Sequence, residues 1–167
     1  MAPNGAKTHP KLDGEEADPI EDALAGQKLD AKAIRNLEVR LSAQPNDLSA
    51  RTKLLGYYFG PRRRSIKASA AQKRHVLWII NNRPAAMIAG LPYCTLNPQA
   101  NKDGYRAARE LWLQQTKAYS DDARILGNAS KFFFTRDPEI AEQLLLRAQT
   151  LEPLNPAWSD SLGQLYA

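Results

Sequence analysis

Apolar residues recur at helical spacing along most of the chain, and cap residues and prolines separate the stripes. Ile34, Leu37 and Leu41 follow Asp30 at spacings of three and four, which predicts a helix that stops before Pro45. From residue 20 onward the chain therefore favours one helix after another. Signals of this kind predict helices over about 30–44, 47 or 49 to 59, 65–82, 102–118, 122–135, 138–152 and 156–166.

Two stretches depart from the simple pattern. The second half of the 65–82 segment is apolar nearly all round, which is typical of a buried helix. A strand over 75–80 is the alternative, because β-branched and aromatic residues favour strands; we prefer the helix, since the neighbouring segments are helical. Between 84 and 98, breakers predict irregular backbone with at most one helical turn at 85–89. These breakers are Pro84, Gly90, Pro92 and Pro98.

An ordered pattern of small, large and proline positions repeats along the chain. An offset of 34 residues maps Ala141 to Ala107 and Leu145 to Leu111, and the same order begins again near Ala33. The unit between these, over 62–98, is expanded and irregular. In the C-terminal part the pattern consists of Ala141, Leu145, Ala148, Pro153, Leu162-Gly163 and Tyr166.

This order of residues resembles the tetratricopeptide repeat, a helix–turn–helix unit of about 34 residues. The resemblance covers about 30–167 and is closest from residue 121 onward; Trp158 stands one position earlier than the family's large residue before Leu-Gly. It implies an all-α fold in which helix–turn–helix repeats stack as a short α-solenoid with an irregular, expanded middle unit. It also implies a scaffold that binds a peptide or protein segment in a groove.

Residues 1–19 are polar and lack apolar periodicity, so we expect a disordered tail before a repeat domain at 20–167. The longest apolar run, 76–80, is far too short to span a bilayer, and the N-terminus shows no apolar signal segment. Cys94 is the only cysteine, which excludes an intrachain disulfide. We therefore expect a cytoplasmic protein without a membrane partner.

The net charge of +5 is unevenly distributed. No acidic residue lies between Asp47 and Asp103, whereas ten Lys and Arg residues do. This asymmetry indicates an anionic partner, either an acidic protein segment or nucleic acid, and a solvated face neutralised by neighbouring carboxylates is the alternative. The candidate binding residues are Arg62, Arg63, Arg64, Lys67, Lys73 and Arg74.

Catalytic motifs are scarce. His75 adjoins the apolar run and fits a packed or surface histidine better than a general base. A pair of Cys94 with His75 is the remote enzymatic option. Neither a phosphate-binding loop nor a common metal-ligand motif is present, and the paired acids Asp121-Asp122 suit a helix cap. We therefore predict a protein that is not an enzyme and needs no cofactor or metal.

Three successive phenylalanines supply a second candidate surface. Phe132 matches a packing position of the repeat, and helical geometry turns each following residue by about 100°, so the three cannot share one face. Either Phe133 or Phe134 is expected to face the groove, with Leu126 and Ser130 nearby. The main hypothesis is thus a protein-interaction module, and a nucleic-acid-associated factor using 62–74 is the alternative.

Overall fold

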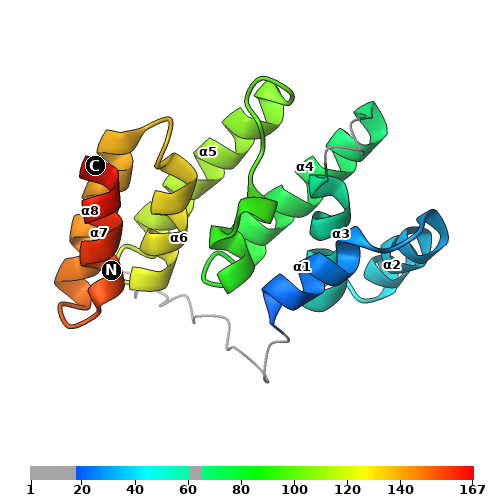
Figure 1. The fold of residues 1–167 in the computed structure, drawn as a ribbon, viewed down its shortest axis with the longest axis horizontal. Helices are drawn as coiled ribbons and strands as arrows, with labels where there is room; N and C mark the ends of the chain where they lie inside the picture. Colours follow the sequence, from blue (N-terminus) through cyan, green and yellow to red (C-terminus); the bar gives the residue numbers. More distant parts are fainter. Residues whose placement is uncertain (1–17, 61–64) are drawn as a thin grey trace, which may run out of the picture.

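A computed structural model describes residues 18–60 and 65–167, and these fold into eight α-helices and two short 3₁₀ helices. Within these two ranges no residue forms a strand, so the predicted all-α class is confirmed. The helices succeed one another along the long axis of the molecule, from α2 at one end to α7 and α8 at the other (Figure 1). Their bounds are α1 Pro19–Gln27, α2 Ala31–Ala43, α3 Leu48–Phe59, α4 Ile66–Asn82, η2 Met87–Gly90, η3 Pro92–Cys94, α5 Lys102–Ala118, α6 Ala123–Phe133, α7 Pro138–Leu151 and α8 Pro156–Tyr166.

Short polar side chains set most helix starts. The carboxylates of Asp30 and Asp47 accept the N–H groups of Ala33 and Ala50, at 2.7 and 2.9 Å. Ser65 caps α4 in the same way, and α4 is the helix rather than the alternative strand. The predicted helix boundaries hold to within two residues, because the caps that fix them are readable in the sequence.

The first helix begins earlier than the predicted boundary at residue 20. Asp18 accepts the N–H of Ile20 at 2.8 Å, and Pro19 is the first helical residue. Both were assigned to the tail; the missing signal was the Asp-Pro pair, which suits an N-cap followed by a first turn. The rest of the predicted tail, 1–17, lies outside the described residues.

Helices α4 and α5 run parallel, because the chain returns between them without a second helix. Asn101 donates to Ser69 Oγ at 3.1 Å near their starts, and Gln115 donates to the carbonyl of Asn81 at 3.2 Å near their ends. The returning segment 83–101 contains only the single turns η2 and η3. This is the irregular middle unit that the sequence predicts, and it interrupts an otherwise stacked array of helices.

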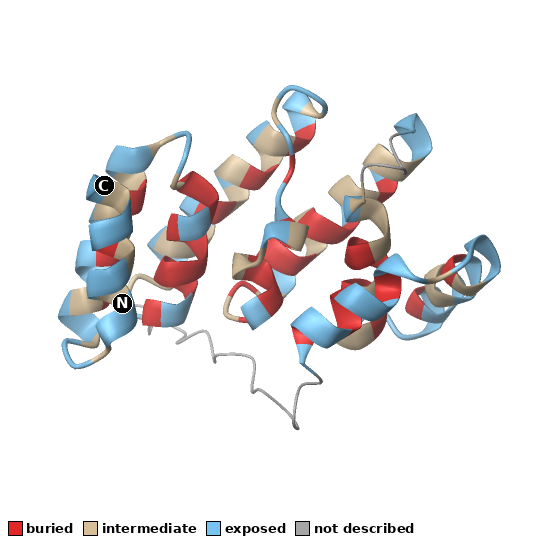
Figure 2. Cartoon of the chain, viewed as in Figure 1, coloured by how far each residue is buried: buried red, intermediate tan, exposed pale blue. Residues whose placement is uncertain are grey.

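Buried side chains line the facing sides of successive helices (Figure 2). The main core cluster runs through the middle of the stack and is centred on Trp112 and Phe133, both fully buried. On α5 the buried small–large pair is Ala108 and Trp112, one residue later than the expected pair at 107 and 111. The repeat between α5 and α7 is therefore 33 residues, and the insertion lies earlier in the chain.

Candidate functional site

The basic segment is only partly described. Arg62, Arg63 and Arg64 lie outside the described residues. On α4, Lys67 is exposed and Lys73 half-buried, whereas Arg74 places Nη2 2.9 Å from Glu38 Oε2. One of the three described cations is thus already paired within the protein, as the alternative of a neutralised face expects.

Glu38 organises a polar cluster between α2, α3 and α4. Its carboxylate accepts hydrogen bonds from His75 Nε2 at 3.0 Å, Tyr58 Oη at 3.1 Å and Arg74 Nη2. Burial alone would raise the pKa of Glu38, but the bond and charge of His75 and the charge of Arg74 lower it to about 2. The carboxylate therefore stays ionised and holds three helices together.

Arg51 fixes the protonation state of His75. Its Nη1 lies 3.1 Å from His75 Nδ1, and because a guanidinium only donates, Nδ1 accepts and Nε2 carries the proton toward Glu38. Burial lowers the pKa of His75; Glu38 opposes this change, and Arg74 and Arg51 add to it. The ring is a neutral, 1% exposed structural bridge, which agrees with the packed histidine expected from the sequence.

Arg51 is itself buried between the helices. Its guanidinium lies over the ring of Trp78 at 3.7 Å, and Nη2 donates to the carbonyl of Pro45 at 2.7 Å. Burial lowers the pKa of Arg51 to about 10, with the nearby charge of Arg74 adding to the effect while Glu38 and Asp47 oppose it. Arg51 thus contributes to packing, and its position leaves no room for a ligand.

The predicted groove residues on α6 need correction. Leu126, Ser130 and Phe133 are 0%, 2% and 0% exposed, so a partner on the surface does not reach them. Phe132 also packs inward, stacking on Tyr105, and Phe134 is half-buried at the end of α6. The cause is that α5, η2 and α7 cover α6 on several sides, and the repeat pattern at the irregular unit did not show this.

Cys94 is buried in the main core at 1% exposure. Burial raises the pKa of its thiol to about 12, so a thiolate is absent at neutral pH. Across 18–60 and 65–167, no group of three or more His, Cys, Asp or Glu side chains could hold a metal ion. The same ranges contain no helix that is both long and apolar enough to cross a membrane.

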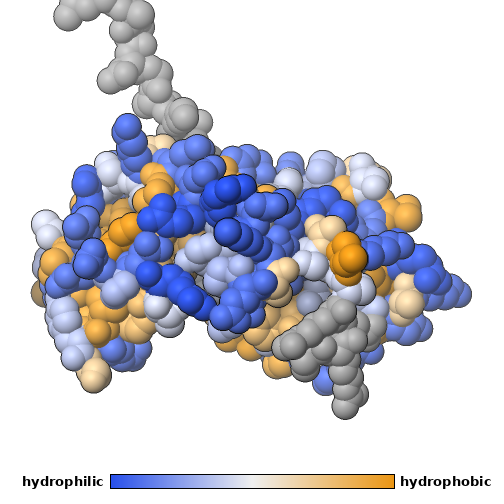
Figure 3. All heavy atoms as spheres, turned by 90° about the horizontal axis from the view of Figure 1, so that it is seen from above, coloured by the Kyte–Doolittle hydropathy of each residue, from blue (hydrophilic) through white to orange (hydrophobic). Residues whose placement is uncertain are grey.

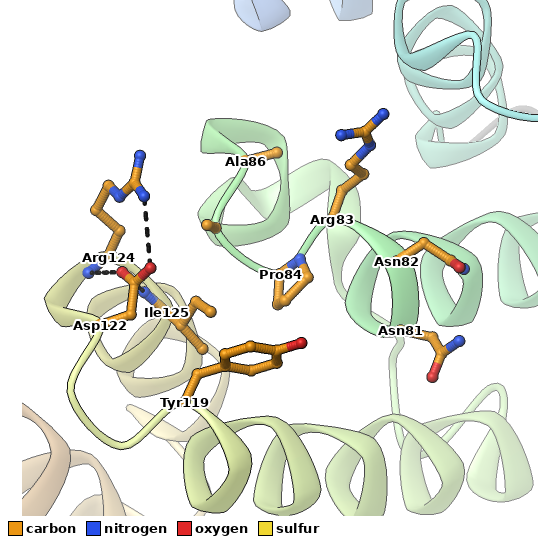
Figure 4. Close-up of a pocket in the computed structure, with 10 residues that line it drawn as sticks. Asn81, Asn82, Arg83, Pro84, Ala86, Tyr119, Asp122, Arg124 and Ile125 are labelled. Atoms are coloured by element: carbon orange, nitrogen blue, oxygen red, sulfur yellow. Dashed lines mark hydrogen bonds and ion pairs between the residues drawn. The ribbon is translucent and has the colours of Figure 1, made fainter. Parts of the chain in front are cut away.

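A small pocket lies where α4 and α5 end and α6 begins (Figure 4). Its volume is about 50 Å³, and the ring of Tyr119 lies below Pro84 and Ile125 on its wall. Arg124 pairs with Asp122 on one side at 3.4 Å, while the side chain of Arg83 points away from this pair. This pocket is too small for more than a single side chain.

A larger hollow of about 210 Å³ adjoins the small pocket and shares Ala85 and Arg124 with it. It lies along the outer face of α6, between η2 on one side and α8 on the other. We call this hollow the α6 groove. Its lining residues are Ala85, Met87, Arg124, Gly127, Asn128, Lys131 and Trp158.

Specific contacts fix both walls of the α6 groove. The amide of Asn128 donates to the carbonyls of Pro84 and Ala86 at 2.9 and 3.0 Å, which holds the segment before η2 against α6. On the other wall Trp158 lies directly on Gly127, where a Cβ would come within 2.5 Å of the indole. Only glycine allows this contact, so the groove is preformed.

Comparison with known proteins gives no match: no family model, curated protein or solved structure resembles the chain. The tetratricopeptide resemblance therefore stays a prediction, while helix packing consistent with a solenoid is observed. The sequence did contain one signal for the α6 groove. Arg124 and Lys131 are seven residues apart, so they share one helix face with Gly127 and Asn128 between them.

Proposed function

We propose that this chain is a non-catalytic protein-interaction module that binds a protein segment in the α6 groove. One observation carries the proposal: the second unit has only η2 where a full helix would otherwise stand, and the outer face of α6 stays open between η2 and Trp158. An open hollow with rigid walls favours binding, because little conformational entropy is lost when a partner orders there.

The lining of the α6 groove combines the two kinds of contact that recognition sites use. Met87 is 56% exposed and Trp158 half-buried, which offers apolar contact area, while Arg124 and Lys131 are exposed cations. Elsewhere apolar residues are dispersed: on the face shown in Figure 3 hydrophilic residues predominate and apolar residues form separate spots. The groove is thus better suited to a short segment than to a large flat interface.

A random peptide-display selection on the purified chain tests the proposal. Enriched peptides are synthesised and their Kd measured by fluorescence polarisation with the unmodified chain, with Met87→Ala and with the control Leu113→Ala, which changes an exposed residue of α5. We expect micromolar binding that Met87→Ala weakens and Leu113→Ala leaves unchanged. No enrichment above an unrelated protein, or equal binding by both variants, would contradict it.

Binding of nucleic acid through 62–74 is a second proposal. The exposed side chain of Lys67 on α4 supports it, whereas the Arg74–Glu38 ion pair removes one cation from the surface. Titration of single-stranded and duplex oligonucleotides across a salt series separates the two ideas, because phosphate contacts weaken steeply with salt. Salt-steep binding that Lys67→Ala reduces would favour nucleic acid; absence of binding at low salt would remove it.

A further inference from the structure

The α6 groove has an uneven charge. Arg124 and Lys131 are exposed at its two ends, and Arg83 lines the adjoining small pocket. Asp122 is the one carboxylate that lines either hollow. Both of its oxygens are engaged: Oδ1 accepts the N–H groups of Arg124 and Ile125, and Oδ2 faces the Arg124 guanidinium. The surface offered to a partner is therefore cationic.

The two cations differ in how they are held. Arg124 lies within 3.4 Å of Asp122, an exposed contact that costs little to share. Lys131 has no ion-pair partner among the described residues, and its exposed ammonium group extends from the last turn of α6. An incoming carboxylate at Lys131 thus displaces only water, while one at Arg124 joins an existing pair.

The middle of the groove is apolar and shaped for one side chain. Met87 forms one wall and the indole of Trp158 the other, above Gly127. The indole N–H points elsewhere, because Nε1 donates to Glu152 Oε2 at 3.2 Å. The ring therefore presents a carbon surface, and the volume of about 210 Å³ is near that of one large aliphatic residue.

From this arrangement we propose that the α6 groove binds an acidic protein segment, with one apolar side chain between Met87 and Trp158 and flanking carboxylates at Arg124 and Lys131. Seven residues of α6 span roughly 10 Å, and an extended peptide covers this in about three residues. The segment is thus a short one in which two acidic residues bracket an apolar residue. This inference rests on the proposed function and specifies its partner.

Charge complementarity favours this occupant over nucleic acid. A nucleic acid chain is read by several stacking faces and a longer row of cations, whereas this groove has one indole face that is occupied at its edge by Gly127. A peptide satisfies the two cations and the apolar centre together. Binding of an oligonucleotide in this groove is accordingly an outcome that would overturn the inference.

A charge-swap experiment tests the inference. Three synthetic peptides have one leucine between two positions about three residues apart, which are both Glu, both Gln, or Glu and Lys. Their Kd values are measured with the unmodified chain, with Lys131→Glu and with the matched control Lys117→Glu on α5. Lys117 is also exposed, lies in the last turn of its helix and does not line the α6 groove.

We expect the Glu peptide to bind more tightly than the Gln peptide. Lys131→Glu should weaken the Glu peptide about five-fold and Lys117→Glu less than two-fold, since a single exposed charge contact contributes about 1 kcal/mol or less before reversal. The peptide with one lysine should regain affinity for Lys131→Glu. This rescue is the decisive result, because a merely structural effect of the substitution would not depend on the charge of the peptide.

The failures are distinguishable. If peptides from the display selection bind but lack acidic residues, or if Lys131→Glu and Lys117→Glu behave alike, the acidic-segment inference is overturned and the interaction module stands. If no peptide of any composition binds, both are overturned. If oligonucleotides compete with the Glu peptide and bind more tightly than it does, the groove is a nucleic-acid site and the inference is again wrong.

Discussion

The two ends of the helix stack are held together by different chemistry. In the C-terminal half the large buried position of α7 is Leu145, and 33 residues earlier on α5 it is Trp112. At successive steps of 37 residues the same series reaches His75 and then Glu38, which hydrogen-bond to each other. One end is therefore packed by apolar contact and the other by a charged network.

This difference has a physical consequence. Apolar packing is insensitive to pH, whereas the Glu38–His75–Arg51 network depends on which groups are ionised. The α6 groove lies on the apolar side of this divide, beyond the irregular unit. The stability of the N-terminal helices can therefore change with acidity while the walls of the groove keep their shape.

Leu145→Ala is expected to have the largest effect on stability. Leu145 is 1% exposed in α7, and truncation of such a leucine costs about 3 kcal/mol in the free energy of unfolding. The neighbour Leu146 is 45% exposed, so Leu146→Ala should cost less than about 0.5 kcal/mol. Urea denaturation followed by circular dichroism measures both, and equal losses would show that α7 does not pack as described.

Glu38→Gln should come next. The substitution keeps the shape but removes the charge that faces His75, Arg74 and Arg51, and we expect a loss of about 2 kcal/mol at neutral pH. Glu110→Gln on α5 is the matched control, since Glu110 is exposed. A loss no larger than that of the control would mean that the polar cluster does not hold α2 to α4.

Acidification should weaken the N-terminal helices in two stages. The folded pKa of His75 is depressed, so its contribution to stability is full above its ordinary pKa of 6.5 and declines as pH falls below that value. The pKa of Glu38 is also depressed, to about 2 from 4.5, so a second loss occurs below pH 4.5. Denaturation midpoints across this pH range report both stages.

His75→Gln separates the two stages. Glutamine retains a neutral donor and acceptor but does not titrate, so the stage near pH 6.5 should disappear while the loss below pH 4.5 remains. The other histidine, His9, lies outside the described residues. If the variant keeps the same pH dependence around 6.5, another group titrates on unfolding and the assignment to His75 is wrong.

Trp112→Phe should have the smallest effect. The indole Nε1 of Trp112 is buried without a hydrogen-bond partner, so removal of this group relieves an unfavourable burial while it leaves a small cavity. The two effects oppose each other, and we expect a net loss of about 1 kcal/mol or less. A loss above about 3 kcal/mol would indicate that the N–H group has a partner after all.

The sequence predicted the helices well because their signals are local. Asp30, Asp47 and Ser65 mark starts through their own side chains, and the breakers of 84–98 correctly predicted an irregular stretch. The parallel course of α4 and α5 was not predicted, since it depends on contacts such as Gln115 with Asn81 across 34 residues. Local patterns indicate where helices lie but not which faces meet.

The candidate site shows the same limit more strongly. The sequence selected Phe133 for the groove because its helix position was free in the repeat pattern, but the structure buries it at 0% exposure. It passed over Arg124 and Lys131, whose spacing was visible, because η2 and α8 supply the walls from distant segments. Trp158 was noted only as displaced by one position, and that displacement places it on Gly127.

The indole N–H resonances of the three tryptophans test the central claim most directly. Trp158 lines the α6 groove, Trp78 lies on Arg51 in the polar cluster, and Trp112 is buried in the main core. Titration of ¹⁵N-tryptophan-labelled chain with the Glu peptide should shift the Trp158 resonance and leave the other two in place. A shift at Trp78 with none at Trp158 would place the partner on the basic side of the molecule and contradict the account.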